Sequence, residues 1–156
     1  MPDLSLLMLM DQVRRHTLRV LEGVTEEEAR WAPPGLRNTI LWHAGHCFVV
    51  VESLTMRALG REPEFPENWF EMFKWKGDPA EVPADWWPAL VEVVAELQAQ
   101  VGRLRPLIAE LSDEQLAGPV PEKPERTVRF YILHGLRDEA HHAGEIWLLR
   151  KIQEAG

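Results

Sequence analysis

The chain has 156 residues, of which 46% are hydrophobic and 27% are charged, and this length and composition predict one globular domain over residues 1–156. Its net charge is −8, with Lys and Arg scattered among acidic residues, which excludes a nucleic-acid partner because such a partner requires a basic surface. No apolar run approaches the roughly 20 residues that span a bilayer, so a membrane-spanning protein is also excluded.

Two long helices are predicted in the first part of the chain. Apolar residues recur every three or four positions over residues 3–22, and again from an N-cap at Asn38 or Thr39 to about residue 60. The β-branched residues 49–51 lie inside the second pattern and are therefore assigned to the helix.

The connection over residues 61–87 is rich in aromatic residues and prolines, and a short helix beginning at Trp69 or Phe70 fits its sequence. Two interpretations are open. The connection forms a lid or pocket wall on which a substrate packs, or its aromatic rings pin a long connection to the bundle or form a dimer contact. Its aromatic residues are Phe65, Trp69, Phe70, Phe73, Trp75, Trp86 and Trp87.

A third helix is predicted to start after Pro83, with Pro88 in its first turn, and to reach Leu104. Pro106 is expected to kink or end it.

A fourth helix is predicted from about Thr127 to Ile152, and no strand or hairpin is predicted anywhere. The first and third helices are each followed by a capping-box pattern, at residues 25–29 and 112–116, then by a proline-containing loop and a long helix with histidines. Two such helix pairs packed face to face predict an all-α four-helix bundle, with both histidine-bearing helices at one centre.

Five of the six histidines lie on the second and fourth helices. On the fourth helix, one stripe with three- and four-residue steps has apolar ends and ionisable residues in its middle. Charged residues outside this stripe, Glu139 among them, are assigned to the solvent side. The stripe consists of Tyr131, His134, Asp138, His142, Glu145, Leu149 and Ile152.

A carboxylate buried without a partner in a bundle core is very costly, so this stripe needs a cation or dedicated hydrogen bonds. A carboxylate and a histidine of one helix, with His46 opposite them, make a three-ligand metal site with open positions. The alternative is a structural network in which Asp138 holds His134 or His142 by hydrogen bonds.

The single cysteine, Cys47, excludes an internal disulfide and fits a reducing compartment. No secretory pattern precedes the first helix, since Asp3 comes early, and we therefore expect a cytoplasmic protein. Cys47 itself is either a metal ligand or nucleophile, or a small buried hydrophobic residue.

Two segments carry a resemblance to a known family. Residues 38–46 (NTILWHAGH) and 138–146 (DEAHHAGEI) resemble the DinB-like (damage-inducible, YfiT-type) metalloprotein superfamily, and the resemblance covers essentially the whole chain. In that family one histidine of the second helix and two histidines of the fourth helix hold a metal ion.

By position, the resemblance implies that His46 and His142 are ligands, and that Asp138 stands where the family has its third histidine. Asp138 still ligates a hard or borderline metal, which gives a site of two histidines and one carboxylate. His43 and His141 are alternative third ligands. The implied cofactor is a divalent metal ion, zinc first, with nickel, manganese or iron as alternatives.

The resemblance also implies an enzyme. Characterised members use a low-molecular-weight thiol, such as bacillithiol or mycothiol, to attack or isomerise electrophilic substrates. A bound metal generates a thiolate or a hydroxide near neutral pH, so a thiol S-transferase and a hydrolase are both open. Glu145, at the position of the family's usual glutamine, and His43 are the candidate catalytic residues, as orienting groups or proton acceptors.

Two other functions remain open: a metal-binding or stress-response module without turnover, and a metal-free dimerisation domain. The expected partners are a small-molecule substrate and a second copy of the chain. The homodimer rests on the family and on the aromatic segment 61–87.

Overall fold

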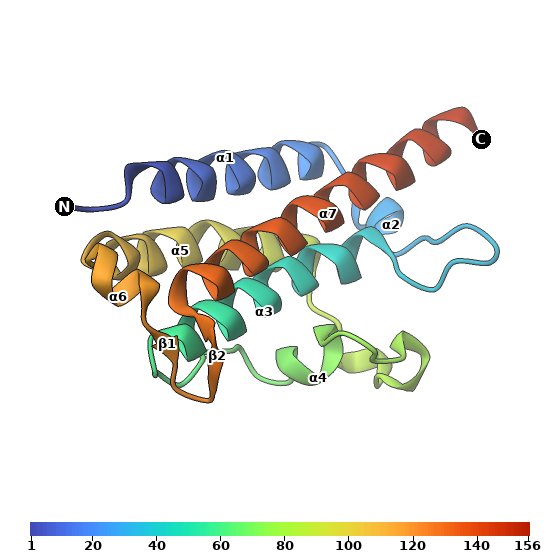
Figure 1. Ribbon diagram of the computed structural model, residues 1–156. Coiled ribbons are helices and arrows are strands. Elements are labelled where there is room, and N and C mark those ends of the chain that lie inside the picture. Colours follow the sequence, from blue (N-terminus) through green and yellow to red (C-terminus); the bar gives the residue numbers. More distant parts are fainter.

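The computed structural model describes residues 1–156 and contains seven α-helices and one small β-hairpin. The four long helices are α1 (Leu4–Leu21), α3 (Ile40–Ala58), α5 (Leu90–Ala109) and α7 (Val128–Ala155) (Figure 1). They form a bundle in which α7 packs on α3 and on α1, while α5 packs on α1 and α3. The predicted all-α four-helix bundle is confirmed, and its two histidine-bearing helices lie side by side.

Short helices connect the long ones. They are α2 (Glu26–Ala29), α4 (Trp69–Phe73) and α6 (Asp113–Ala117), together with the 3-10 turns η1 (Pro79–Glu81) and η2 (Ala84–Trp86). Both predicted capping boxes are present, the first between Thr25 and Glu28 and the second between Ser112 and Gln115. The repeated pattern therefore marks the same short helix after α1 and after α5.

The prediction that the chain has no hairpin is wrong. Strand β1 (Pro119–Val120) pairs antiparallel with β2 (Lys123–Thr127), just before α7. All five residues of β2 are exposed, so the segment lacks the alternation of apolar and polar residues that predicts a strand.

The third long helix also begins later than predicted, at Leu90 instead of directly after Pro83. A proline disfavours helical geometry in the residue before it, so Pro88 separates the short turn η2 from α5. Pro106 lies inside α5, which continues to Ala109. The flanking Leu104 and Ile108 are buried in the core, and this packing holds the helix together through the proline.

Helix α3 is buried along nearly its whole length because α4, α5 and α7 cover it. It therefore carries polar side chains, including His43 and His46, into the interior. None of the helices combines the length and apolar character needed to cross a membrane.

The aromatic connection packs against α3 through α4, and the predicted short helix at Trp69 is confirmed. Trp69 and Phe73 are buried, and the Trp42 indole of α3 donates a hydrogen bond to the Met72 carbonyl at 3.1 Å. A Cβ atom on Gly45 would lie 2.3 Å from a ring carbon of Phe73. Only glycine at this position lets the Phe73 ring approach α3 so closely.

Candidate metal centre

Three side chains from α3 and α7 converge at one point of the bundle. The Asp138 Oδ2 atom lies 3.1 Å from His46 Nε2 and 3.5 Å from His142 Nε2. One donor atom of each residue lies within 4.8 Å of the others. The structure thus brings together the same three residues that the sequence predicts as ligands.

The antiparallel packing of α3 and α7 produces this convergence. His43, near the start of α3, contacts His142 in the second half of α7. Further along α3, Val51 lies against Gly135, which comes earlier in α7. A Cβ atom on Gly135 would lie 3.5 Å from the Val51 Cα, so the helices approach closely enough for their polar side chains to meet.

The His46 ring is held in one orientation. Its Nδ1 donates to the Phe73 carbonyl at 2.6 Å, and its face stacks on Trp42 at a centroid distance of 4.7 Å. A carbonyl only accepts hydrogen bonds, so Nδ1 carries the hydrogen, and Nε2 of the neutral ring presents a lone pair to Asp138. Two acceptors then face each other, and a proton or a metal ion must lie between them.

The His142 ring has a second partner on its far side. Its Nδ1 lies 2.8 Å from His43 Nδ1, and His43 Nε2 lies 3.1 Å from Glu145 Oε2. One assignment of hydrogens satisfies the whole line: His142 donates to His43, and His43 donates to Glu145. The His142 Nε2 atom then points a lone pair toward Asp138, as His46 does.

The charges at the site favour metal binding. Burial lowers the pKa of His43 to about 3 and that of His142 to about 4, and neighbouring histidines lower both further. Burial opposes ionisation of Asp138, but the close approach of His46 and the charge interactions with neighbouring histidines lower its pKa overall. At neutral pH His142 is therefore a neutral imidazole and Asp138 a carboxylate, which are the forms that bind a metal ion.

The two alternative third ligands do not belong to the group of donor atoms formed by His46, Asp138 and His142. His141 is exposed, and its Nε2 lies 2.9 Å from Glu145 Oε1. His43 belongs to a second group of converging donor atoms, with His142 and Glu145. In the hydrogen-bonded line just described, both His43 nitrogens already have partners within the protein.

The prediction that Glu139 faces solvent is wrong. Its carboxylate is fully buried and accepts hydrogen bonds from Arg14 at 2.7 and 3.0 Å and from Thr17 at 2.8 Å. Arg14, also buried, donates in addition to the side chain of Gln100. Because α7 is enclosed by α1 as well as by α3, it has a second buried side that a one-stripe pattern misses.

Cys47 is fully buried beside the backbone of Glu139, with its Sγ atom 3.7 Å from that carbonyl. Burial raises the pKa of its thiol, and it belongs to neither group of converging donor atoms. The structure thus agrees with the interpretation of Cys47 as a small buried hydrophobic residue.

Two groups that hold His46 were absent from the sequence prediction. Trp42 lies four residues before His46, and this spacing alone was a signal that the two rings share a helix face. The Phe73 carbonyl belongs to the backbone of a distant connection, and nothing in the sequence points to it.

Two cavities flank the centre. One, of about 400 Å³, is lined by His46, Val50, Leu54, Trp75, His134 and Asp138. The other, of about 270 Å³, lies beyond His43 and Glu145 and includes Arg37 and Asn38 in its wall. Two of the three converging side chains, His46 and Asp138, therefore line the first cavity.

A family model described as the DinB superfamily matches residues 9–146. A search of curated proteins finds no match. The crystal structure of a conserved protein from Enterococcus faecalis superposes with a TM-score of 0.78 at 16% sequence identity, covering 100% of this chain and 99% of that chain. At this identity the likeness shows a shared fold.

Proposed function

Because this chain belongs to the DinB superfamily, we propose that His46, Asp138 and His142 hold one divalent metal ion, zinc first, within one domain over residues 1–156. The proposed activity is a metal-dependent reaction on a small-molecule substrate in the cytoplasm. A low-molecular-weight thiol is the proposed cosubstrate of an S-transferase, and water is the alternative, which gives a hydrolase.

One observation carries this proposal: the Nε2 atoms of His46 and His142 both face the same carboxylate oxygen, while the Nδ1 atom of each ring has a hydrogen-bond partner elsewhere. The Asp138 Oδ2 atom lies 3.1 Å from one and 3.5 Å from the other. Placing lone pairs against each other in a half-buried site is unfavourable. A divalent ion satisfies all three at once, and imidazole nitrogen and carboxylate oxygen are ligands that zinc accepts.

When bound, the ion lowers the pKa of a coordinated thiol or water so that a thiolate or hydroxide forms near neutral pH. The residues of the chain orient the site. Phe73 holds His46, while Glu145 acts through His43 to keep the His142 Nε2 lone pair directed at the centre. We therefore assign Glu145 and His43 as positioning residues, which narrows the catalytic role predicted for them.

Elemental analysis of the purified protein tests the proposal. We expect about one equivalent of metal in the unmodified chain, and its loss in His46→Ala and His142→Ala. His141→Ala is the matched control, because His141 is the exposed neighbour on the same helix. A protein without metal, whose melting is unchanged by EDTA, would support the metal-free dimerisation domain.

Activity assays then separate turnover from binding alone. Thiol consumption with an electrophilic substrate supports the S-transferase, and hydrolysis of an activated ester without thiol supports the hydrolase. A metal-loaded protein that shows neither reaction and binds no added thiol would support the binding module.

We also propose a homodimer formed through the outer face of α7. Exposed positions on this face are spaced by three and four residues: Phe130, Leu133, Arg137, Ala140, Gly144, Trp147 and Lys151. This is the spacing of a helix–helix seam. Apart from the adjoining stretch of α7 itself, no atom lies within 4 Å of the place where a Cβ on Gly144 would be. An antiparallel second copy of α7 would cross at Ala140 and Gly144.

In this arrangement Arg137 of each copy meets the Trp147 ring of the other, a cation–π contact, so the seam is self-complementary. Light scattering tests it with Trp147→Glu, which we expect to be monomeric. Val91→Glu is the control, since Val91 is an exposed apolar residue on α5. A monomeric unmodified chain, or equal effects of both substitutions, would contradict this interface.

A further inference from the structure

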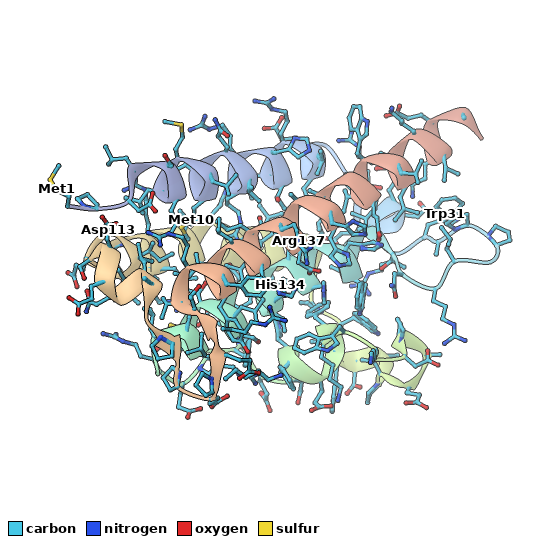
Figure 2. All side chains as sticks on the ribbon, in the orientation of Figure 1. Met1, Met10, Trp31, Asp113, His134 and Arg137 are labelled. Atoms are coloured by element: carbon cyan, nitrogen blue, oxygen red, sulfur yellow. The ribbon has the colours of Figure 1, made fainter.

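The cavity that reaches the converging ligands has walls without a positive charge. His46 and Asp138 lie on one side, and Val50, Leu54 and Trp75 form apolar walls. No lysine or arginine lines it. His134 completes the lining, and Figure 2 shows His134 in the middle of α7, close to Arg137.

Trp75 is the one large aromatic side chain of this cavity. It is 46% exposed, and it takes part in none of the aromatic contacts that join the buried rings of the connection to α3, such as that between Trp69 and Phe48. Its indole therefore offers a free apolar surface of the kind on which a flat ligand packs.

The cavity on the other side of the centre differs in charge. Arg37 and Asn38 are in its wall, but His43 and Glu145 separate it from the converging ligand atoms. Arg37 also lies 3.4 Å from Asp78. An anionic group on a ligand bound at the centre would thus find no cationic partner in the cavity that it occupies.

The charges at the proposed metal site also disfavour a ligand that carries a carboxylate. A divalent ion and the Asp138 carboxylate together carry one positive charge, which a single thiolate neutralises. A further carboxylate on the same ligand would place an uncompensated charge in a partly dehydrated, apolar cavity.

We propose that the cavity between His46 and Trp75 binds the uncharged aromatic or apolar part of a thiol or electrophilic substrate, packed on the Trp75 indole, and excludes ligands that also carry a carboxylate. This inference rests on the proposed metal site. It narrows the substrate class, because thiols that also carry a carboxylate do not fit this cavity.

Three thiols test the proposal on cobalt-loaded protein, with the cobalt–thiolate absorption band as the measure of binding. Phenylmethanethiol carries the ring alone, 4-(mercaptomethyl)benzoate adds a carboxylate to it, and 2-mercaptoethanol lacks the ring. We expect phenylmethanethiol to bind about tenfold more tightly than either of the others.

Substitutions of two tryptophans test whether Trp75 causes the preference for phenylmethanethiol. We expect Trp75→Ala to reduce the advantage over 2-mercaptoethanol to within about twofold, and Trp75→Phe to retain most of it. Trp86→Ala is the matched control, because Trp86 is a 37% exposed tryptophan of the same connection outside this cavity. Circular dichroism checks that each variant is folded.

The outcomes separate the inference from the proposed function. Equal binding of the three thiols, or equal effects of Trp75→Ala and Trp86→Ala, would overturn the inference while leaving the metal site in place. If the protein retains no cobalt, the proposed metal site itself fails.

Discussion

Asp138 and Glu139 are consecutive carboxylates on α7, yet they lie in opposite surroundings. Glu139 is fully buried, and its oxygens accept hydrogen bonds from Arg14 and Thr17. Asp138 is half-buried and faces two imidazole nitrogens at the edge of a cavity. A carboxylate whose partners are all in the protein serves stability, whereas one left facing other acceptors is available to a ligand.

The largest expected effect comes from breaking the buried ion pair between Arg14 and Glu139. Glu139→Ala leaves the Arg14 guanidinium buried without its counter-ion, and we expect a loss of roughly 3–5 kcal/mol in the free energy of unfolding. Urea denaturation in EDTA measures it, with Asp138→Ala as the control. A smaller loss in the free energy of unfolding for Glu139→Ala than for Asp138→Ala would contradict the conclusion that Glu139 is the carboxylate that serves stability.

The next effect is on metal affinity. We expect His142→Ala and Asp138→Asn to weaken metal binding by roughly a hundredfold or more, beyond what loss of an outer hydrogen-bond partner costs. Competition with a coloured chelator measures this. Asp138→His gives a set of three histidine ligands and should retain the metal. Unchanged affinity in Asp138→Asn would remove Asp138 from the ligand set.

A smaller loss of metal affinity is expected when the hydrogen bonds that run from His142 through His43 to Glu145 are broken. Glu145→Leu removes the acceptor of His43, and we expect metal affinity to fall by about 10- to 100-fold. Glu145→Gln keeps an acceptor oxygen and should lose less. The same chelator competition measures both variants. If the two substitutions have equal effects, the hydrogen bond to His43 does not orient the site.

The smallest expected effect is the pH dependence of the free energy of unfolding. In metal-free protein, the pKa of His43 is lowered to about 3 and that of His142 to about 4, so between about pH 6.5 and 4 the unfolded chain binds protons that the folded chain does not. The free energy of unfolding should therefore fall as the pH is lowered through this range.

Urea denaturation in EDTA at a series of pH values measures this effect. The fall should be shallower in His142→Gln, which has one fewer of the two shifted histidines. The same pH dependence in the variant and the unmodified chain would contradict the assignment.

The sequence predicted the four long helices and both capping boxes because their apolar spacing and cap residues are local signals. It also predicted that His46, Asp138 and His142 come together, because Asp138 and His142 lie one turn apart on one helix, and the repeated helix pairs and the family resemblance place His46 opposite them. To predict the contact of His43 with His142, one must know how α3 and α7 are aligned along their length. The close approach at Gly135 shows that alignment, and no local pattern reveals it.

Glu139 and the hairpin were predicted wrongly for different reasons. The buried side of Glu139 depends on where α1 lies, and the spacing within α7 cannot show this. Strand β2 is held by backbone pairing, and its exposed side chains carry no strand pattern. Metal identity, domain extent and the homodimer remain predictions.

The Phe73 carbonyl that holds His46 also joins two equilibria. If α4 moves away from α3, His46 loses the partner that orients it, so docking of the connection and metal binding must strengthen each other by the same factor. Gly45, which admits the Phe73 ring, thereby couples the docking of this connection to the orientation of His46. Metal-loaded protein should resist proteolysis between α3 and α5 better than metal-free protein.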